Sequence, residues 1–120
     1  MLKVHIKKFG TSVILCLQGR IVIGGTLELC ETMEGLTDVT SIVFDLNGVS
    51  LIDAHGLGFM LELQEQLKAK GIEFRLMRLT ERVRRVFEIT RLNTVFEIMS
   101  QPKVLTLSRK VGPQGLAVCA

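Results

Sequence analysis

The chain has 120 residues, of which 48% are hydrophobic, so it fits one domain with its own core and is too apolar to be disordered. Its longest apolar run, residues 13–17, is far shorter than the roughly 20 residues of a membrane-spanning helix, which argues against such a span. The net charge of +3 comes from the C-terminal residues, because residues 1–100 hold 12 basic and 12 acidic side chains, and a neutral body without basic runs argues against nucleic-acid binding.

The first part of the chain predicts a hairpin followed by a helix. Residues 3–8 alternate between apolar and polar side chains, and residues 12–18 form a largely apolar run, so both are expected to be strands. Gly10 lies in the short connection between them, which is typical of a hairpin. Thr26 is a suitable N-cap for a helix that we expect over residues 26–35.

Residues 41–58, with the sequence SIVFDLNGVSLIDAHGLG, are the most informative segment. Their first six residues predict a buried strand, which Asn47-Gly48 is expected to interrupt. Helical spacing begins at Asp53-Ala54-His55-Gly56 and predicts a helix over residues 55–70. A strand, a turn and then a helix that opens at a polar cluster present free backbone N–H groups to an anion or a partner.

The rest of the chain continues the alternation of strands and helices. We expect a strand over residues 72–77, a helix over 80–90 capped by Thr80, a short strand over 95–98 and a short terminal helix between 100 and 112. Strand-helix repeats require parallel strands, and the initial hairpin adds an antiparallel one. The expected fold is therefore α/β: a mixed sheet of about five strands, the first antiparallel, with about four helices.

The segment 41–58 resembles the signature of the STAS domain, the module found in sulfate transporters and anti-sigma factor antagonists. That signature is an apolar strand, then Asp-Ser-Ser-Gly-Leu-Gly, then an apolar helix, and this chain has Ala54 and His55 in place of the two serines. Residues 85–98 resemble the closing stretch of the family, with Arg91 in place of a usual glycine. The resemblance covers roughly residues 1–110, which we expect to form the STAS domain, with residues 111–120 as a loosely ordered tail.

The resemblance implies a bacterial, cytoplasmic, non-catalytic domain that regulates transcription through protein–protein interaction. Its expected partner is an anti-sigma factor or an ATPase of the histidine-kinase fold. In the antagonists the second serine is phosphorylated by the kinase partner, and here His55 occupies that position. We therefore expect no serine phosphorylation at the usual site. A monomer or a weak dimer is expected.

The expected partner-binding residues are Asp53, Ala54, His55, Gly56 and Phe59. Asp53 is expected to cap the helix, and the family pattern gives the matching aspartate a supporting role beside the phosphoserine. His55 has three interpretations. It is a surface residue without a specific role in a domain that has lost its phosphorylation switch, a hydrogen-bonding contact to a partner or an anion, or a phosphohistidine. Phe59 either tucks under a neighbouring loop or anchors a partner.

A helical wheel places the core-facing stripe of the helix over residues 55–70. Leu57, Met60, Leu61 and Leu67 fall on that stripe together with Gln64, whereas His55, Phe59, Glu62 and Gln66 fall on the opposite side and Leu63 on the border. We expect both Met60 and Leu61 to be buried.

No residues suggest an enzyme, a metal site or a cofactor. The two histidines, His5 and His55, have no nucleophile or carboxylate at a spacing typical of a catalytic triad, and the three cysteines lack the spacing of metal ligands. The arginines of residues 80–91 form either a solvated face or a docking face for an acidic partner or phospholipid headgroups. Two other functions remain open: a soluble STAS subunit of an ABC-type lipid transporter, and a ligand-sensing domain.

Overall fold

The computed structural model describes residues 2–99. Their elements, in chain order, are β1 Leu2–Phe9, β2 Ser12–Ile21, α1 Leu27–Glu34, β3 Ser41–Ile52, α2 Ala54–Ala69, β4 Glu73–Met77, α3 Glu81–Ile89, the 3-10 helix η1 Leu92–Thr94 and β5 Glu97–Ile98. The five strands form one sheet in the order β1-β2-β3-β4-β5. β1 is antiparallel to β2, and the other pairs are parallel.

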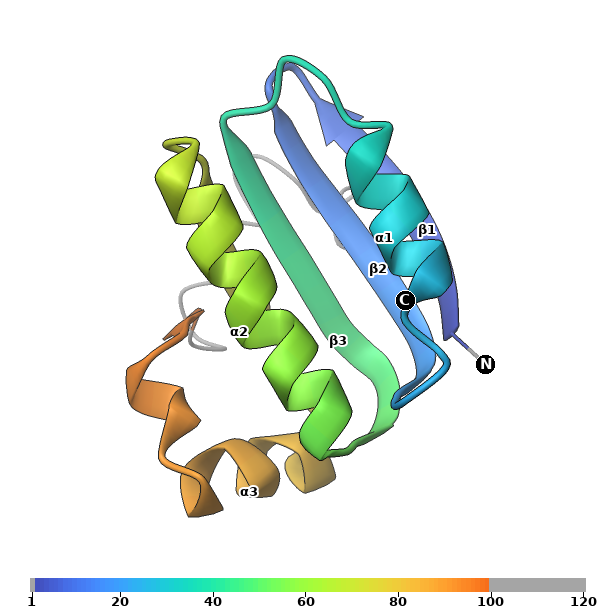
Figure 1. Cartoon of the computed structure of the whole chain (residues 1–120), viewed down its shortest axis with the longest axis vertical. Coiled ribbons are helices and arrows are strands. Elements are labelled where there is room, and N and C mark those ends of the chain that lie inside the picture. Colours follow the sequence, from blue (N-terminus) through green and yellow to red (C-terminus); the bar gives the residue numbers. More distant parts are fainter. Residues whose placement is uncertain (1, 100–120) are drawn as a thin grey trace, which may run out of the picture.

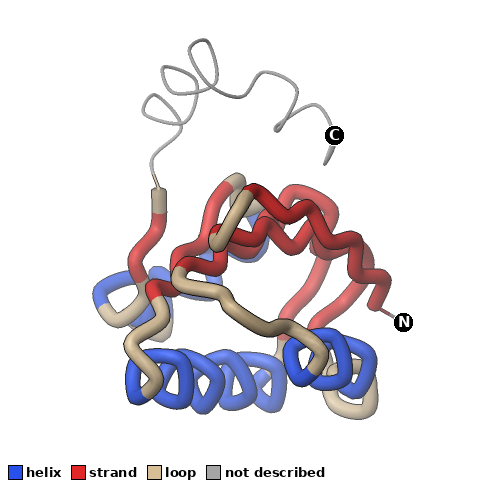
Figure 2. Tube along the Cα trace, turned by 90° about the horizontal axis from the view of Figure 1, so that it is seen from above, coloured by secondary structure: helices blue, strands red, loops and turns tan. Residues whose placement is uncertain are grey.

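Two layers make up the fold. Figure 1 shows α1 and α2 lying across the same face of the sheet, and the view in Figure 2 shows them as a separate layer beneath the strands. α3 lies at the end of the sheet where β3 leads into α2 (Figure 1). The expected mixed sheet of five strands is confirmed. The described residues contain three α-helices rather than about four, because the expected terminal helix and the tail 111–120 lie outside them.

The core lies between the sheet and the two covering helices. Alternate residues of the central strands face α1 and α2, and each is at most 1% exposed: Val13, Leu15 and Leu17 on β2, Ile42, Phe44 and Leu46 on β3, and Leu76 on β4. The buried apolar side chains of α2 complete the core. Burial of these apolar side chains supplies most of the driving force that holds the helices on the sheet.

β3 does not end at Asn47-Gly48, in contrast to the expectation from the sequence. The strand runs on to Ile52 because the pairing with β2 shifts by one residue, from Cys16 opposite Asp45 to Gln18 opposite Gly48, which is a β-bulge. A Cβ at Gly48 would lie 2.9 Å from the Leu17 carbonyl oxygen, so the bulge requires glycine here. The extended strand carries the chain to the far end of the sheet, where α2 begins.

The buried stripe of α2 is rotated from the one expected. Met60 is fully buried as expected, but Leu61 is only half-buried, whereas Leu63 is 7% exposed. Neighbours on both sides of the helix cause the difference. Leu63 faces the groove toward α1, and Gln64 on the other side donates its Nε2–H to the carbonyl oxygen of Val95 at 3.0 Å.

A buried ion pair holds α3 in place. Asp45 on β3 is 1% exposed, and both of its carboxylate oxygens accept hydrogen bonds from Arg78, the shortest from Nη2 at 2.7 Å. Arg78 follows β4 directly and leads to Thr80. The Thr80 hydroxyl donates to the Val49 carbonyl at 3.0 Å and accepts from the Val83 N–H at 3.4 Å, which caps α3 as expected.

Arg91 adopts a backbone conformation that favours glycine. Its φ is +62° and its ψ is 18°, the left-handed region, at the turn between α3 and η1. This geometry explains why the family signature has glycine at the matching position. The chain forms the same turn with arginine, at some cost in backbone strain.

Candidate functional site: the start of α2

The first turn of α2 is an exposed helix end with a capped N-terminus. Asp53 is the N-cap residue, in an extended conformation, and its Oδ1 accepts a hydrogen bond from the Gly56 N–H at 2.8 Å. The expected capping role of Asp53 is thereby confirmed. Ala54 and His55 are the next two residues, and both are exposed. They therefore occupy a surface position at the start of a rigid helix.

The same carboxylate also binds a second segment of the chain. Asp53 Oδ2 accepts a hydrogen bond from the Ile23 N–H at 3.2 Å, and the Asp53 N–H donates to the Ile21 carbonyl at 3.3 Å. Ile23 lies in the loop between β2 and α1, thirty residues away in sequence. One side chain thus joins the β2–α1 loop to the start of α2, a link that the sequence did not indicate.

Gly56 allows the close approach of α2 to β2. Gly56 is buried, and a Cβ at this position would overlap the Ile21 carbonyl oxygen. Gly58, two positions further along the family signature, has open space around it, with nothing within 4 Å of the corresponding Cβ. The two glycines of the Gly-Leu-Gly run therefore have different roles, and only the first is required by packing.

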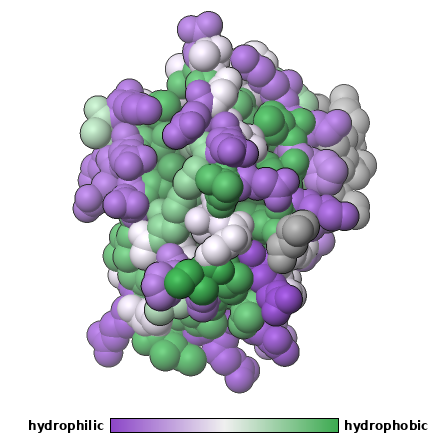
Figure 3. Space-filling model, turned by 45° about the vertical axis from the view of Figure 1, so that its right-hand side comes forward, coloured by the Kyte–Doolittle hydropathy of each residue, from purple (hydrophilic) through white to green (hydrophobic). Residues whose placement is uncertain are grey.

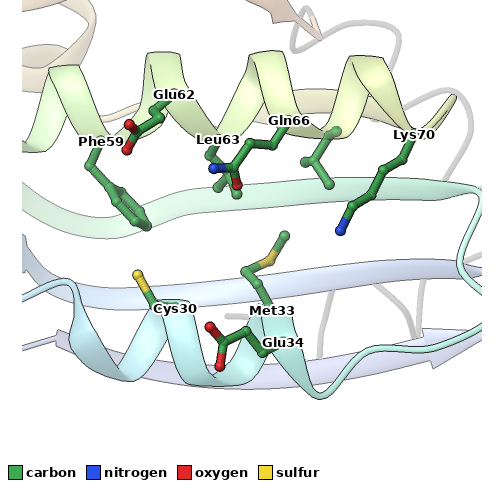
Figure 4. A pocket seen from close by; sticks show the side chains of 9 residues that line it. Cys30, Met33, Glu34, Phe59, Glu62, Leu63, Gln66 and Lys70 are labelled. Atoms are coloured by element: carbon green, nitrogen blue, oxygen red, sulfur yellow. The ribbon is translucent and has the colours of Figure 1, made fainter.

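Phe59 points away from the exposed first turn. It is half-buried, packs against the core, and projects into the groove between α2 and α1, where Cys30 and Met33 approach it from the opposite helix (Figure 4). The groove encloses about 280 Å³. Burial, together with the charges of Glu34 and Glu62, raises the pKa of the Cys30 thiol above 9.0, so the thiol stays protonated and is a weak nucleophile.

The residue whose N–H binds Asp53 Oδ2 also exposes an apolar side chain. Ile23, whose N–H binds Asp53, is 65% exposed. It borders a shallow hollow of about 350 Å³ formed by the β2–α1 loop together with Leu2 and Leu27. Figure 3 brings this side of the molecule forward and shows apolar residues among polar ones over its lower half. The run Ile21-Val22-Ile23 before Gly24-Gly25 was the sequence signal for this feature.

Residues 2–99 gather no set of three or more His, Cys, Asp and Glu side chains that could bind a metal ion. The hydroxyl nearest to His55 in sequence, that of Ser50, donates to the Gly19 carbonyl at 3.3 Å. No helix in this part of the chain is long and apolar enough to cross a membrane.

The two glycines of this helix predict opposite effects of the same substitution. Gly56→Ala should lower the free energy of unfolding by about 2–4 kcal/mol, because the new Cβ meets a backbone carbonyl that can move only with β2. Gly58→Ala is the matched control and should raise it by about 0.5–1 kcal/mol, since alanine is the better helix former and the site is open. Chemical denaturation measures both, and a neutral Gly56→Ala would contradict the close approach.

The carboxylate of Asp53 predicts a pH dependence of stability. The hydrogen bond from the Gly56 N–H lowers the pKa of Asp53 below its ordinary value of 3.8; the Ile23 N–H and the proximity of His55 act in the same direction, while partial desolvation opposes them. Because the pKa of Asp53 is lower in the folded protein than in the unfolded chain, its carboxylate stabilises the protein at pH values above the unfolded-state pKa. This contribution is lost as the pH falls through the folded-state pKa.

Asp53→Asn removes this titration and keeps the shape of the side chain. The difference in free energy of unfolding between the wild type and Asp53→Asn should be largest near neutral pH and should shrink as the pH falls below about 4. Denaturation curves measured from pH 7 to pH 2.5 test this. If the difference in free energy of unfolding grew as the pH fell, the ionised Asp53 carboxylate would not be stabilising the folded protein.

The comparisons with known proteins agree with this architecture. The family model of the STAS domain matches residues 3–105. The anti-sigma-B factor antagonists of Listeria monocytogenes and of Listeria innocua are each 35% identical to this chain over 72 residues. That match spans 60% of this chain and 60% of the length of each relative.

Solved structures share the fold at lower identity. An anti-sigma factor antagonist from Mycobacterium paratuberculosis superposes with a TM-score of 0.70 at 21% identity, over 92% of this chain and 96% of the other. The antagonist SpoIIAA in its unphosphorylated form gives a TM-score of 0.68 at 18% identity, over 91% and 98%. With the family model matching almost the whole described chain, the protein belongs to the STAS domain family.

Proposed function

We propose that this chain is a non-catalytic regulatory domain of the anti-sigma factor antagonist type, which binds an anti-sigma factor or an ATPase of the histidine-kinase fold through the start of α2. The observation that carries the proposal is the exposed first turn, Ala54 and His55, fixed by Asp53 and Gly56 next to the exposed Ile23. The similarity to the Listeria antagonists supports the class of partner.

The five expected partner-binding residues divide into two roles in this proposal. Ala54 and His55 contact the partner directly, because both side chains are exposed. Asp53 positions that turn through the hydrogen bonds of its carboxylate, and Gly56 does so through its close approach to Ile21. Phe59 contributes only the part of its ring that remains exposed at the groove.

In this proposal Ile23 supplies an apolar anchor, which was one of the two roles expected for Phe59. An exposed isoleucine gains free energy when a partner removes it from water, and a backbone held by Asp53 loses little conformational entropy on binding. A small apolar centre surrounded by polar residues is the usual composition of a binding hot spot. Ile23 and His55 therefore form the proposed contact together.

We further propose that serine phosphorylation does not control this contact. Neither Ala54 nor His55 carries a hydroxyl, and the hydroxyl of Ser50 is directed to the Gly19 carbonyl. Where serine phosphorylation controls such a contact, the phosphate at the docking surface adds negative charge that opposes binding. Without an acceptor, the domain binds constitutively or is controlled through its partner.

Partner capture separates this proposal from the two alternatives. Affinity purification of the full chain from its own cells should recover a protein with the histidine-kinase ATPase fold. Recovery of an ABC transporter ATPase instead would contradict the proposal and favour the lipid-transporter subunit. A bound metabolite in the groove between α1 and α2, with no protein partner, would favour the ligand-sensing function.

Restoring a serine at the acceptor position tests the absence of the switch. Incubated with ATP and the captured kinase, the wild type should gain no acid-stable phosphate within residues 53–58. His55→Ser places a hydroxyl at the helix start, where free N–H groups and the helix dipole stabilise added negative charge. This variant should be phosphorylated and then bind the partner more weakly.

Binding before and after ATP, measured by titration calorimetry for the wild type and for His55→Ser, provides the comparison. Ala54→Ser is the matched control, since it puts a hydroxyl at the position of the first serine, which is not the acceptor in the family signature. Release of the wild type on addition of ATP would show that phosphate goes to another residue, such as His55 itself. The absence of serine control would then be wrong.

A further inference from the structure

Charge is strongly segregated along this chain. No Lys or Arg occurs between Arg20 and Lys68, and this stretch holds eight acidic residues. Residues 68–91 hold eight basic and three acidic residues. Residues 1–20 hold four further basic residues and no acidic one, so an acidic stretch of the chain lies between two basic stretches.

α1 carries the acidic side of this arrangement. Leu27, Glu31 and Glu34 are spaced at i, i+4 and i+7, so they lie along one face of the helix. All three residues are exposed, Leu27 at 68%, and Glu34 also borders the groove toward α2 (Figure 4). The helix has no basic residue to neutralise its glutamates. We refer to Leu27, Glu31 and Glu34 as the α1 face.

α3 carries the basic side. Arg82, Arg85 and Ile89 are spaced at i, i+3 and i+7 on one face of this helix, and Ile89 is 75% exposed. Together with Glu81 and Val86 they line a shallow hollow of about 280 Å³. Among residues 2–99, the ion pairs use Arg75 and Arg78 but none of the arginines of α3. We refer to Arg82, Arg85 and Ile89 as the α3 face.

The two faces match when the helices run antiparallel. Along α1, Glu31 follows Leu27 by four residues and Glu34 follows after three more. Along α3, Arg85 precedes Ile89 by four residues and Arg82 precedes Arg85 by three, so the spacing is the same in the reverse direction. An antiparallel contact therefore sets Leu27 against Ile89, Glu31 against Arg85 and Glu34 against Arg82. Each apolar residue meets an apolar residue and each acid meets a base.

We propose that a second copy of this chain docks its α1 face on the α3 face, in antiparallel orientation. The contact cannot form within one copy, because α1 lies at one side of the fold and α3 lies at the end of the sheet beyond α2 (Figure 1). Since α1 and α3 lie on opposite sides of the fold (Figure 1), a pair of copies forms this contact only once, and the contact is heterologous. Each copy in a pair keeps one unused face, so association continues head to tail.

The contact is weak and depends on salt. Exposed ion pairs are screened within roughly 10 Å at about 0.1 M salt, and two short helices bury less surface than a stable dimer requires. The proposal does not rest on the proposed function, because it involves this chain alone. It also uses neither His55 nor Ile23.

Sedimentation equilibrium of the full chain tests the association. The protein is measured in reducing buffer, which removes any contribution from its three cysteines. At about 20 mM salt the mean molar mass should rise with protein concentration past that of a dimer, and at about 0.5 M salt it should return to that of the monomer. A chain that remains monomeric at low salt and high concentration would overturn the proposal.

Charge reversal identifies the surfaces. Glu31→Arg/Glu34→Arg makes both faces basic and Arg82→Glu/Arg85→Glu makes both acidic, so each variant alone should be monomeric. An equimolar mixture should associate again, because every face then has an opposite partner. Glu65→Arg, an exposed charge change on α2 outside both faces, should leave association unchanged.

Circular dichroism melting of each variant verifies that it is folded before the masses are compared. Association that persists in both double variants would place the contact elsewhere on the molecule and overturn the assignment. A mixture that stays monomeric, although both variants are folded, would do the same.

Discussion

The carboxylate of Asp53 is the interaction on which the candidate site depends. One oxygen accepts from Gly56 and thereby starts α2, while the other accepts from Ile23 and thereby fixes the β2–α1 loop. The two N–H groups come from two different segments of the chain, the first turn of α2 and the β2–α1 loop. Because Gly56 lies directly against the Ile21 carbonyl, the helix start, the loop and the end of β2 form one rigid unit. A preorganised unit of this kind lowers the conformational-entropy cost of any contact that is made through it.

Much of the fold could be predicted from the sequence because its signals are local. Asp53 and Thr80 cap their helices as their residue types indicate, and the alternation of strands and helices predicts the mixed sheet. The exceptions depend on contacts between elements. β3 continues through Gly48 only because β2 accommodates a bulge, and Leu63 is buried only because α1 stands on that side of α2.

The position of residues 53–56 at the start of α2 could be predicted from the sequence, but the surroundings of Phe59 could not. The segment 53–56 was expected as a unit, but an isolated helical wheel could not show that Phe59 points toward α1, since the position of α1 depends on the sheet. Ile23 was missed for the same reason: its exposure and its bond to Asp53 follow from where the loop crosses the end of β3. The family model matches residues 3–105 although neither Ala54 nor His55 carries a hydroxyl.

The most direct test of the account is the affinity of the captured partner for Ile23→Ala and for Ile6→Ala. Both side chains are exposed, at 65% and 47%, but Ile6 lies on the edge strand β1. If the loop and the start of α2 form the docking surface, Ile23→Ala should weaken binding by about 2 kcal/mol, roughly thirtyfold, and Ile6→Ala should leave it unchanged. Equal affinities for the wild type and Ile23→Ala would contradict the account, because the partner would then bind elsewhere.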